Sequence, residues 1–198
     1  MKKSQIIIGV IVLVLIGWYG YKAANKVAYE DIDAPRPFKG REDAKIVLDE
    51  FSDFQCPGCK SAVDFVKDLD EKYGANIRIN YRHFPLKQIH KYALPSAIAA
   101  ECGNDQGKFW EMHDAIFSYQ TSGQTDSNLR KAAQDAKLDL AKYDACVANK
   151  ANLSVVEADE KAAMNLNLPG TPSFVLNGKI VSDRAQLEPM IKKELGLE

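Results

Sequence analysis

The sequence has no excess of positive charge. Its 26 basic and 27 acidic side chains leave a net charge of −1, and the first 26 residues contain four lysines and no acid. The remaining residues carry a net charge of −5, from 22 basic and 27 acidic side chains. Nonspecific nucleic-acid binding gains its affinity by neutralising phosphates, so this acidic body argues against that class of protein.

Histidine and cysteine are both scarce. The three histidines, at positions 83, 90 and 113, show no metal-ligand spacing, and we expect them to be packed or surface residues. The four cysteines all lie beyond residue 50, and their even number allows two disulfides or one metal site. No repeat or low-complexity segment is present, and 46% hydrophobic residues exclude a wholly disordered chain.

Charge is also missing from Ser4 to Tyr21, a stretch of 18 residues. A helix of this length spans about 27 Å, enough to cross a thin hydrocarbon core. Aromatic residues at positions 18, 19 and 21 match an interfacial belt, and no clean pair of small residues for signal cleavage follows. We expect residues 1–21 to be an N-terminal membrane anchor; a cleaved signal peptide and a buried core helix are the alternatives.

The lysines at the two ends of this segment determine its expected orientation. Those at positions 2 and 3 favour a cytoplasmic amino terminus, and those at 22 and 26 oppose it weakly. The body would then lie outside the cytoplasm, in the periplasm or at the cell exterior, where disulfides persist. Residues 22–40 are expected to form a polar tether, and residues 41–198 are long enough for one substantial core.

The sequence pattern of residues 41–198 predicts an α/β fold with an inserted block of helices. Residues 44–51 are typical of a buried strand, the apolar spacing from Cys59 to Tyr73 predicts a helix, and residues 76–84 alternate as a second strand. Such a unit forms a right-handed crossover with parallel strands. A helical block over about residues 88–166 is expected next, with helices near 96–102, 108–119, 128–136, 141–148 and 155–165.

The carboxyl-terminal part predicts a hairpin and a last helix. Asn177-Gly178 lies between two short apolar runs, over residues 173–181, and this dipeptide is a strong signal for a two-residue hairpin turn. Asp183 can cap a final helix that reaches Leu195.

The motif Cys56-Pro57-Gly58-Cys59 follows the first strand and begins the first helix. Proline suits the first helical position, which leaves Cys56 as an exposed cap. The helix dipole and free N–H groups there lower the pKa of a thiol, whereas Cys59 should face the packed side. This geometry allows a disulfide that is made and broken repeatedly; a structural disulfide and half of a zinc site are the alternatives.

Three segments together resemble one family. EFSDFQCPGC, at 50–59, resembles the active-site segment of the DsbA-like thiol–disulfide oxidoreductases, which are thioredoxin-superfamily proteins with an inserted helical domain. YRHFPL at 81–86 and GTPSF at 170–174 are similar to the family's second strand and cis-proline loop. The resemblance covers roughly residues 40–195 and implies a thioredoxin-like α/β fold with a helical insertion, here preceded by the expected transmembrane helix.

The resemblance also implies roles for individual residues. Cys56 is the expected attacking cysteine and Cys59 the buried resolving one. Glu50 falls where the family places a buried acid that accepts a proton from the resolving thiol; a strand-end glutamate facing water is the alternative. Burial after an apolar strand should raise the pKa of this carboxyl.

Substrate contacts are implied near the same pair. Pro172 is the expected cis-proline, and the Thr171 backbone would bind a substrate strand by β-augmentation. Pro57 and Gly58 would also border the substrate. The strongly oxidising members carry a histidine where this chain has Gly58, so the thiolate should be less stabilised here and the disulfide less oxidising.

Cys102 and Cys146 lie in two predicted helices of the insertion and outside any C-x-x-C motif. We expect a structural disulfide between them, with two free buried thiols or a relay to the active site as alternatives. The aromatic stripe within residues 109–117 is expected to be core, with a substrate groove as the alternative.

The expected anchor and the resemblance together predict a monomeric, membrane-tethered enzyme that introduces disulfides into reduced secreted proteins. Its partners would be those unfolded proteins and a quinone-linked membrane redox protein of the DsbB or VKOR kind, and no cofactor or metal is expected. A disulfide reductase or isomerase is the alternative within this class. A metal-binding protein, such as a copper chaperone that uses the cysteines, is the alternative from a different class.

Overall fold

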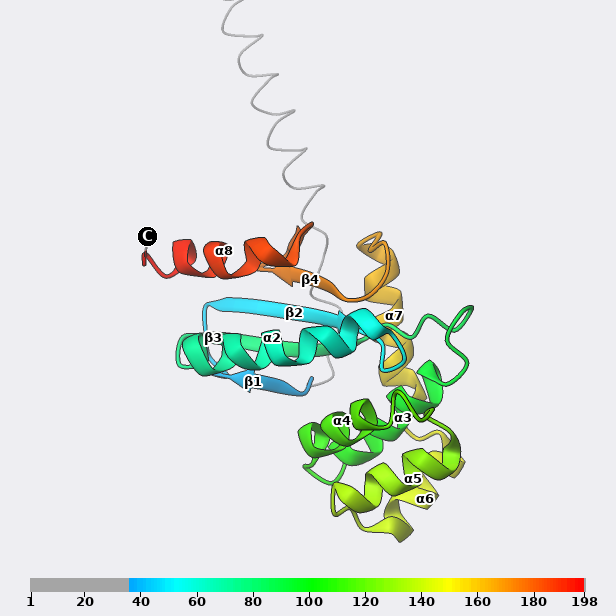
Figure 1. Cartoon of the computed structure of the whole chain (residues 1–198). Helices are drawn as coiled ribbons and strands as arrows, with labels where there is room; N and C mark the ends of the chain where they lie inside the picture. The colour runs from blue at the N-terminus through cyan, green and yellow to red at the C-terminus, as the bar shows by residue number, and fades with distance from the viewer. Residues whose placement is uncertain (1–35, 198) are drawn as a thin grey trace, which may run out of the picture. The chain divides into compact units, whose positions relative to one another are not determined.

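The computed structural model describes residues 36–197, which are built around one mixed sheet (Figure 1). Within this range five strands lie in the order β1-β3-β2-β4-β5. Their bounds are β1 Phe38–Gly40, β2 Ile46–Ser52, β3 Ile77–His83, β4 Ser173–Leu176 and β5 Lys179–Val181. The helices are α2 Pro57–Tyr73, α3 Ala93–Asn104, α4 Phe109–Ser118, α5 Asp126–Asp135, α6 Leu140–Asn149, α7 Leu153–Asn165 and α8 Leu187–Glu194.

The predicted crossover is confirmed at the centre of the sheet. Strands β2 and β3 are parallel, from Ile46 opposite Ile77 to Ser52 opposite His83. Helix α2 connects them, and its apolar positions, spaced for one helical face, are buried against the sheet. Because parallel strands end at the same edge, the amino terminus of α2 lies where both strands finish.

The predicted hairpin is also confirmed. Asn177 and Gly178 have φ angles of 48° and 77°, the left-handed values that a tight two-residue turn requires. The Asn177 side chain accepts a hydrogen bond of 2.8 Å from the Val47 backbone N–H, which attaches the turn to β2. The hairpin therefore places β4 antiparallel to β2, with the segment before β4 close to the start of α2.

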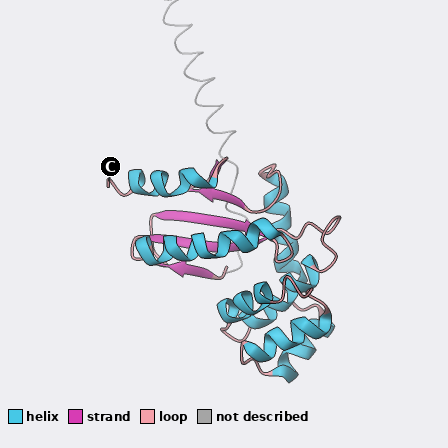
Figure 2. Cartoon of the chain, viewed as in Figure 1, coloured by secondary structure: helices cyan, strands magenta, loops and turns pink. Residues whose placement is uncertain are grey.

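The helical block forms a separate group between β3 and β4 (Figure 2). Its helices pack around a buried cluster that includes four members of the aromatic stripe, Phe109, Met112, Ile116 and Phe117. A second cluster lies among the strands, α2 and α8. The first cluster extends to Phe54, Cys56 and Cys59, so the insertion packs directly against the cysteine motif.

The prediction of a polar tether up to residue 40 is wrong for residues 36–40. Phe38–Gly40 forms the edge strand β1, which pairs with β3, and Arg36 is buried against α7. The two prolines and the glycine of the segment suggested a linker, but Gly40 has a φ of 79° and ends the strand. A three-residue edge strand carries too short a pattern to be recognised without its partner.

Asp159 of α7 ties the insertion to the sheet. Its Oδ1 accepts hydrogen bonds from Arg36 Nε at 2.8 Å and Arg82 Nη1 at 3.2 Å, and its Oδ2 accepts one from the His83 backbone at 3.0 Å. Arg82 also pairs with the buried Asp49 at 2.9 Å. Removing one partner of such a buried pair typically destabilises a protein by about 3–5 kcal/mol, because the remaining charge stays buried.

The predicted membrane anchor, residues 1–21, lies outside the described residues. Among residues 36–197, no helix combines the length and apolar character needed to cross a membrane.

Cys102 and Cys146 form a disulfide that joins α3 to α6. The two cysteines are 44 residues apart, and closing a loop of this length restricts the unfolded chain by about 3–4 kcal/mol in the chain-entropy model. The bond closes a loop inside the insertion, whereas Cys56 and Cys59 are free thiols.

We therefore expect Cys102→Ala/Cys146→Ala to lower the free energy of unfolding by about 3–4 kcal/mol. Urea unfolding of the oxidised proteins measures the loss. Thiol exchange at Cys56 should stay within about twofold of the wild type, because the bond lies apart from that site. Lost exchange with unchanged stability would instead show that the pair relays electrons.

Candidate functional site

The Cys56–Cys59 pair lies at the end of β2 where α2 begins. Cys56 is the N-cap residue of α2, with extended backbone angles, and Pro57 occupies the first turn. The Cys56 carbonyl accepts hydrogen bonds from the backbone N–H groups of Cys59 and Lys60 at 3.1 and 3.2 Å. The first turn thus places both side chains on one side of the helix, where they can form a disulfide.

The two thiols differ less in solvent exposure than the sequence suggested. Cys59 is fully buried, as expected, and its sulfur accepts a hydrogen bond of 3.3 Å from the Asp53 backbone. Cys56 was expected to be exposed, but only 9% of its surface is accessible. The Thr171 carbonyl covers it, accepting a hydrogen bond of 3.2 Å from the Cys56 thiol.

The pKa of Cys56 is nonetheless lowered well below the value of an ordinary thiol. The main cause is a hydrogen bond from the Cys59 side chain. The backbone N–H groups of Gly58 and Cys59, at the start of the helix, add a smaller effect. The helix terminus that the sequence indicated is therefore only part of the reason.

The pKa of Cys59 is raised, and burial is the main cause. A thiolate at this position would lose its hydration, and the hydrogen bond to Cys56 further favours the thiol form. The pair is therefore unequal: Cys56 carries the negative charge and Cys59 keeps its proton.

The cis-proline loop lies directly opposite the motif. The Thr171–Pro172 peptide bond is cis, as predicted. A Cβ added to Gly58 would lie 3.1 Å from Pro172 Cδ, so glycine allows the helix and the loop to approach closely. Pro57 is exposed beside them. A groove of about 280 Å³ opens here, bordered by Gly58, Ser61, Pro172, Phe174, Ser182 and Arg184.

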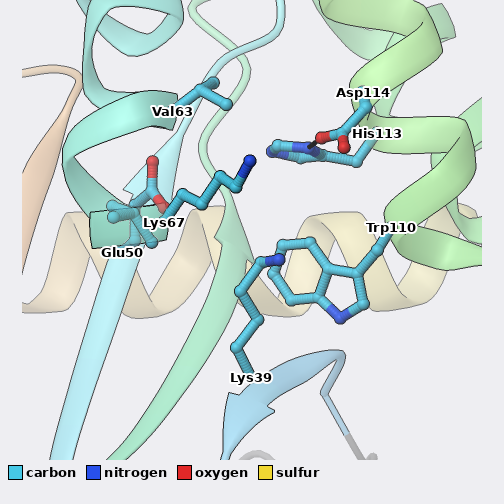
Figure 3. A pocket seen from close by; sticks show the side chains of 8 residues that line it. Lys39, Glu50, Val63, Lys67, Trp110, His113 and Asp114 are labelled. Atoms are coloured by element: carbon cyan, nitrogen blue, oxygen red, sulfur yellow. Dashed lines mark hydrogen bonds and ion pairs between the residues drawn. The ribbon is translucent and has the colours of Figure 1, made fainter. Parts of the chain in front are cut away.

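Glu50 is buried beneath the motif, with 3% of its surface exposed. It borders a cavity of about 40 Å³, shared with Lys39, Lys67, Trp110 and His113, which has room for water (Figure 3). Desolvation raises the pKa of Glu50 to about 7, and the charge of Lys39 partly opposes this effect. The alternative of a strand-end glutamate facing bulk water is therefore wrong.

The far wall of this cavity comes from α4. His113 Nδ1 forms a hydrogen bond of 2.7 Å with the Asp114 carboxylate, which accepts it, and burial lowers the pKa of the His113 imidazole. Lys39 lies over the Trp110 ring, 4.3 Å from its centroid, and Figure 3 shows Lys67 extending toward His113. The cavity thus joins β1, β2, α2 and the insertion, which sequence analysis had not brought together.

Asp53 braces the site in a way that the sequence analysis missed. Its fully buried carboxylate accepts hydrogen bonds from the backbones of Gln55 and Leu86, both at 2.8 Å, and bonds to His90 Nδ1 at 2.7 Å. These bonds connect the loop before Cys56 to the loop after β3. The sequence signal for this role was the position of Asp53, three residues before Cys56.

Two glutamines from the insertion brace the same loop from the other side. Gln120 donates to the carbonyls of Phe54 and Cys56 at 2.8 and 3.1 Å, and Gln124 donates to Phe54 at 2.9 Å. They come from the connection between α4 and α5, about 65 residues away along the chain. No local pattern in the sequence could have identified them.

The structure places Cys56, Cys59, Pro172, Thr171 and Gly58 in one site and Glu50 beneath it. Cys102 and Cys146 belong to the insertion and are joined to each other. Across residues 36–197, no group of three or more histidine, cysteine or acidic side chains is arranged to hold a metal ion.

Several solved structures share this architecture. A thioredoxin-like oxidoreductase from Silicibacter pomeroyi matches with a TM-score of 0.73 and 24% identity, covering 83% of this chain and 95% of that one. The thiol-disulfide exchange protein α-DsbA2 from Wolbachia pipientis gives 0.75 and 19%, covering 90% and 98%. BdbD from Bacillus subtilis gives 0.68 and 24%, covering 81% and 93%. Because these sequence identities are below 25%, the similarity shows a shared fold alone.

Curated relatives carry a different kind of name. The Na⁺/H⁺ antiporter NhaA 3 from Salinispora tropica is 34% identical over 141 residues, which are 71% of this chain and 21% of that protein. The Na⁺/H⁺ antiporter NhaA 1 from Salinispora arenicola is 35% identical with the same coverage. The chain therefore spans about a fifth of the length of these relatives.

A family model described as Thioredoxin matches residues 33–193, which include the cysteine motif, the insertion and the cis-proline loop. The chain therefore belongs to the thioredoxin family, and its fold is that of the DsbA-like thiol–disulfide oxidoreductases.

Proposed function

We propose that this protein is a membrane-tethered, extracytoplasmic thiol–disulfide oxidoreductase that oxidises dithiols in secreted proteins. The observation that carries the proposal is the unequal pair: a low pKa at Cys56 beside the cis-proline loop, and a raised pKa at the buried Cys59. A structural disulfide needs no such difference between its sulfurs, whereas an exchange enzyme needs one attackable sulfur and one that is shielded.

The oxidation proceeds through two exchanges. A substrate thiolate attacks the Cys56 sulfur of the oxidised pair, which forms a mixed disulfide and breaks the Cys56–Cys59 bond with the electron pair going to Cys59. A second substrate thiolate then attacks the substrate sulfur of the mixed disulfide. The substrate leaves with a new disulfide, and Cys56 is released as a thiolate. Because the pKa of Cys56 is lowered, it is a good leaving group in this second step.

Glu50 supplies the proton that this cycle requires at Cys59. The departing Cys59 sulfur is buried and must be protonated, and a carboxyl with a pKa of about 7 can give or take a proton near neutral pH. The adjoining cavity has room for the water that would connect Glu50 to solvent. When the pair is oxidised again, the same carboxylate accepts the Cys59 proton.

Gly58 favours a second candidate, a disulfide reductase or isomerase. A glycine contributes no cation beside Cys56, so the thiolate depends on hydrogen bonds from the Cys59 thiol and from the backbone N–H groups at the helix start. Oxidation is preferred here because those bonds already lower the pKa of Cys56, and a stabilised thiolate makes a disulfide more oxidising.

The tether and the partner are part of the same proposal. The uncharged stretch from Ser4 to Tyr21 supports a membrane anchor that keeps the body near newly exported chains. The longer relatives are named as antiporters, which supports work at a membrane. A quinone-linked membrane protein of the DsbB or VKOR kind would take the electrons from the reduced pair. Recovery of protein that retains Met1 in the membrane fraction is the measurement for this part.

Alkylation tests the inequality of the two thiols. In the reduced protein, iodoacetamide should label Cys56 at pH 6, where an ordinary thiol with a pKa of about 8.5 reacts slowly. Cys59 should stay unlabelled up to pH 9, and peptide mapping by mass spectrometry separates the two. Cys59→Ala should trap mixed disulfides with substrates and Cys56→Ala should not. Equal labelling of both thiols at every pH would contradict the proposal.

The reduction potential decides between oxidation and reduction. For an oxidase we expect a value of roughly −200 to −120 mV from equilibration with glutathione, between the ranges of glutaredoxins and the most oxidising members. Gly58→His should raise the potential, since an imidazolium would stabilise the Cys56 thiolate further. A potential below about −250 mV would instead support the reductase.

Glu50→Gln should change how stability depends on pH. The pKa of Glu50 is about 7 in the folded protein, against an ordinary value of 4.5. Protonation of Glu50 therefore makes its full contribution to the free energy of unfolding below pH 4.5, and this contribution is lost as the pH rises through 7. The variant should therefore match the wild type at pH 4 and exceed its free energy of unfolding by up to about 3 kcal/mol at pH 8.

Urea unfolding of the reduced proteins at both pH values measures this difference. Glu111→Gln is the matched control, because Glu111 is an exposed acid on α4 and should show no such pH-dependent gain. Identical pH profiles for Glu50→Gln and the wild type would show that the carboxyl is not desolvated.

A further inference from the structure

The groove beside the cis-proline loop has a charged side chain in its lining. Gly58 and Ser61 of α2 border it, together with Pro172 and Phe174. Arg184, in the short 3₁₀ turn Arg184–Gln186 after β5, also borders it. A chain segment that engages Cys56 next to Pro172 therefore passes within reach of the Arg184 guanidinium.

Arg184 is held in place without a carboxylate partner. Its guanidinium lies 5.3 Å from the centroid of the Phe65 ring, and its Nη1 is 3.5 Å from Ser61 Oγ. Within residues 36–197, no acidic side chain forms an ion pair with it. The neighbouring Asp183 accepts a hydrogen bond of 2.9 Å from the Ala185 backbone and caps the turn instead. The planar donor fork is thus available to an acid from outside.

We propose that Arg184 makes this oxidoreductase select substrate segments that carry an acidic side chain close to the reacting cysteine. The inference rests on the proposed function, since it names the substrate class of that same site. A carboxylate in the groove would accept two parallel hydrogen bonds from the guanidinium, and the charge on both partners strengthens them. Arg184 is the one charged side chain among the described residues that line this groove, so it distinguishes segments by their charge.

Arg184 is half-buried. Its attraction for a carboxylate is therefore less weakened by solvent than that of a mobile surface lysine. Packing against Phe65 restricts the side chain before substrate arrives, so less conformational freedom is lost on binding. The same charge also favours the ionised form of Glu50 slightly, so a variant at this position can alter the reaction with every substrate. Comparison among substrates of different charge removes that common effect.

The test uses the full-length oxidised protein and three reduced peptides, each with two cysteines, that differ only in having aspartate, asparagine or lysine beside the first cysteine. Acid quenching and mass spectrometry give the rate constant for peptide oxidation. We expect the aspartate peptide to react roughly three- to fivefold faster than the asparagine peptide at low salt, an advantage that added salt reduces. The lysine peptide should be the slowest.

Variants assign that preference to one side chain. Arg184→Gln should remove the advantage of the aspartate peptide and Arg184→Glu should reverse the order in favour of lysine. Arg130→Gln, which removes the same charge from an exposed arginine in the insertion, should leave the order unchanged. Thermal unfolding checks that each variant is folded.

The outcomes separate this inference from the proposed function. Oxidation of all three peptides at equal rates, or a preference for aspartate that survives Arg184→Gln, would overturn the role of Arg184 and leave the oxidase intact. Failure to oxidise any peptide, including the asparagine one, would overturn the proposed function itself.

Discussion

Burial of side chains away from bulk solvent beneath the first turn of α2 is the constraint on which the site depends. Burial keeps Cys59 protonated, and its thiol then donates the hydrogen bond that most lowers the pKa of Cys56. Burial likewise raises the pKa of Glu50 to about 7. One physical cause therefore sets three titrating groups at different values, which a solvated C-x-x-C motif could not do.

Elements from the whole domain shield this region from bulk solvent. The insertion supplies Gln120 and Gln124, which hold the backbone around Phe54, and α7 is fixed to the sheet through Asp159. Asp53 connects the active-site loop to His90 after β3. The insertion thus contributes part of the wall around the cysteine pair, and the Cys102–Cys146 disulfide closes a long loop within it.

The open side of the site has a different character from the closed side. Thr171 and Pro172 lie against Cys56, and Gly58 allows their close approach. Glycine at position 58 places no positive charge next to the thiolate, whereas Arg184 places one in the lining of the groove. The positive charge of Arg184 therefore lies in the region that a substrate would occupy, and not beside the reacting sulfur.

The sequence by itself determined the features that local patterns encode. Apolar periodicity indicated the strand–helix–strand unit, Asn177-Gly178 the hairpin, and the position of Cys56 ahead of Pro57 the helix cap. These succeed because each depends on neighbours within one turn or one strand. Only the tertiary structure decided the limited exposure of Cys56, the strand β1, the cavity beside Glu50 and the position of Arg184 over the groove. Those features depend on which distant segments exclude water from one another, and no spacing along the chain records that.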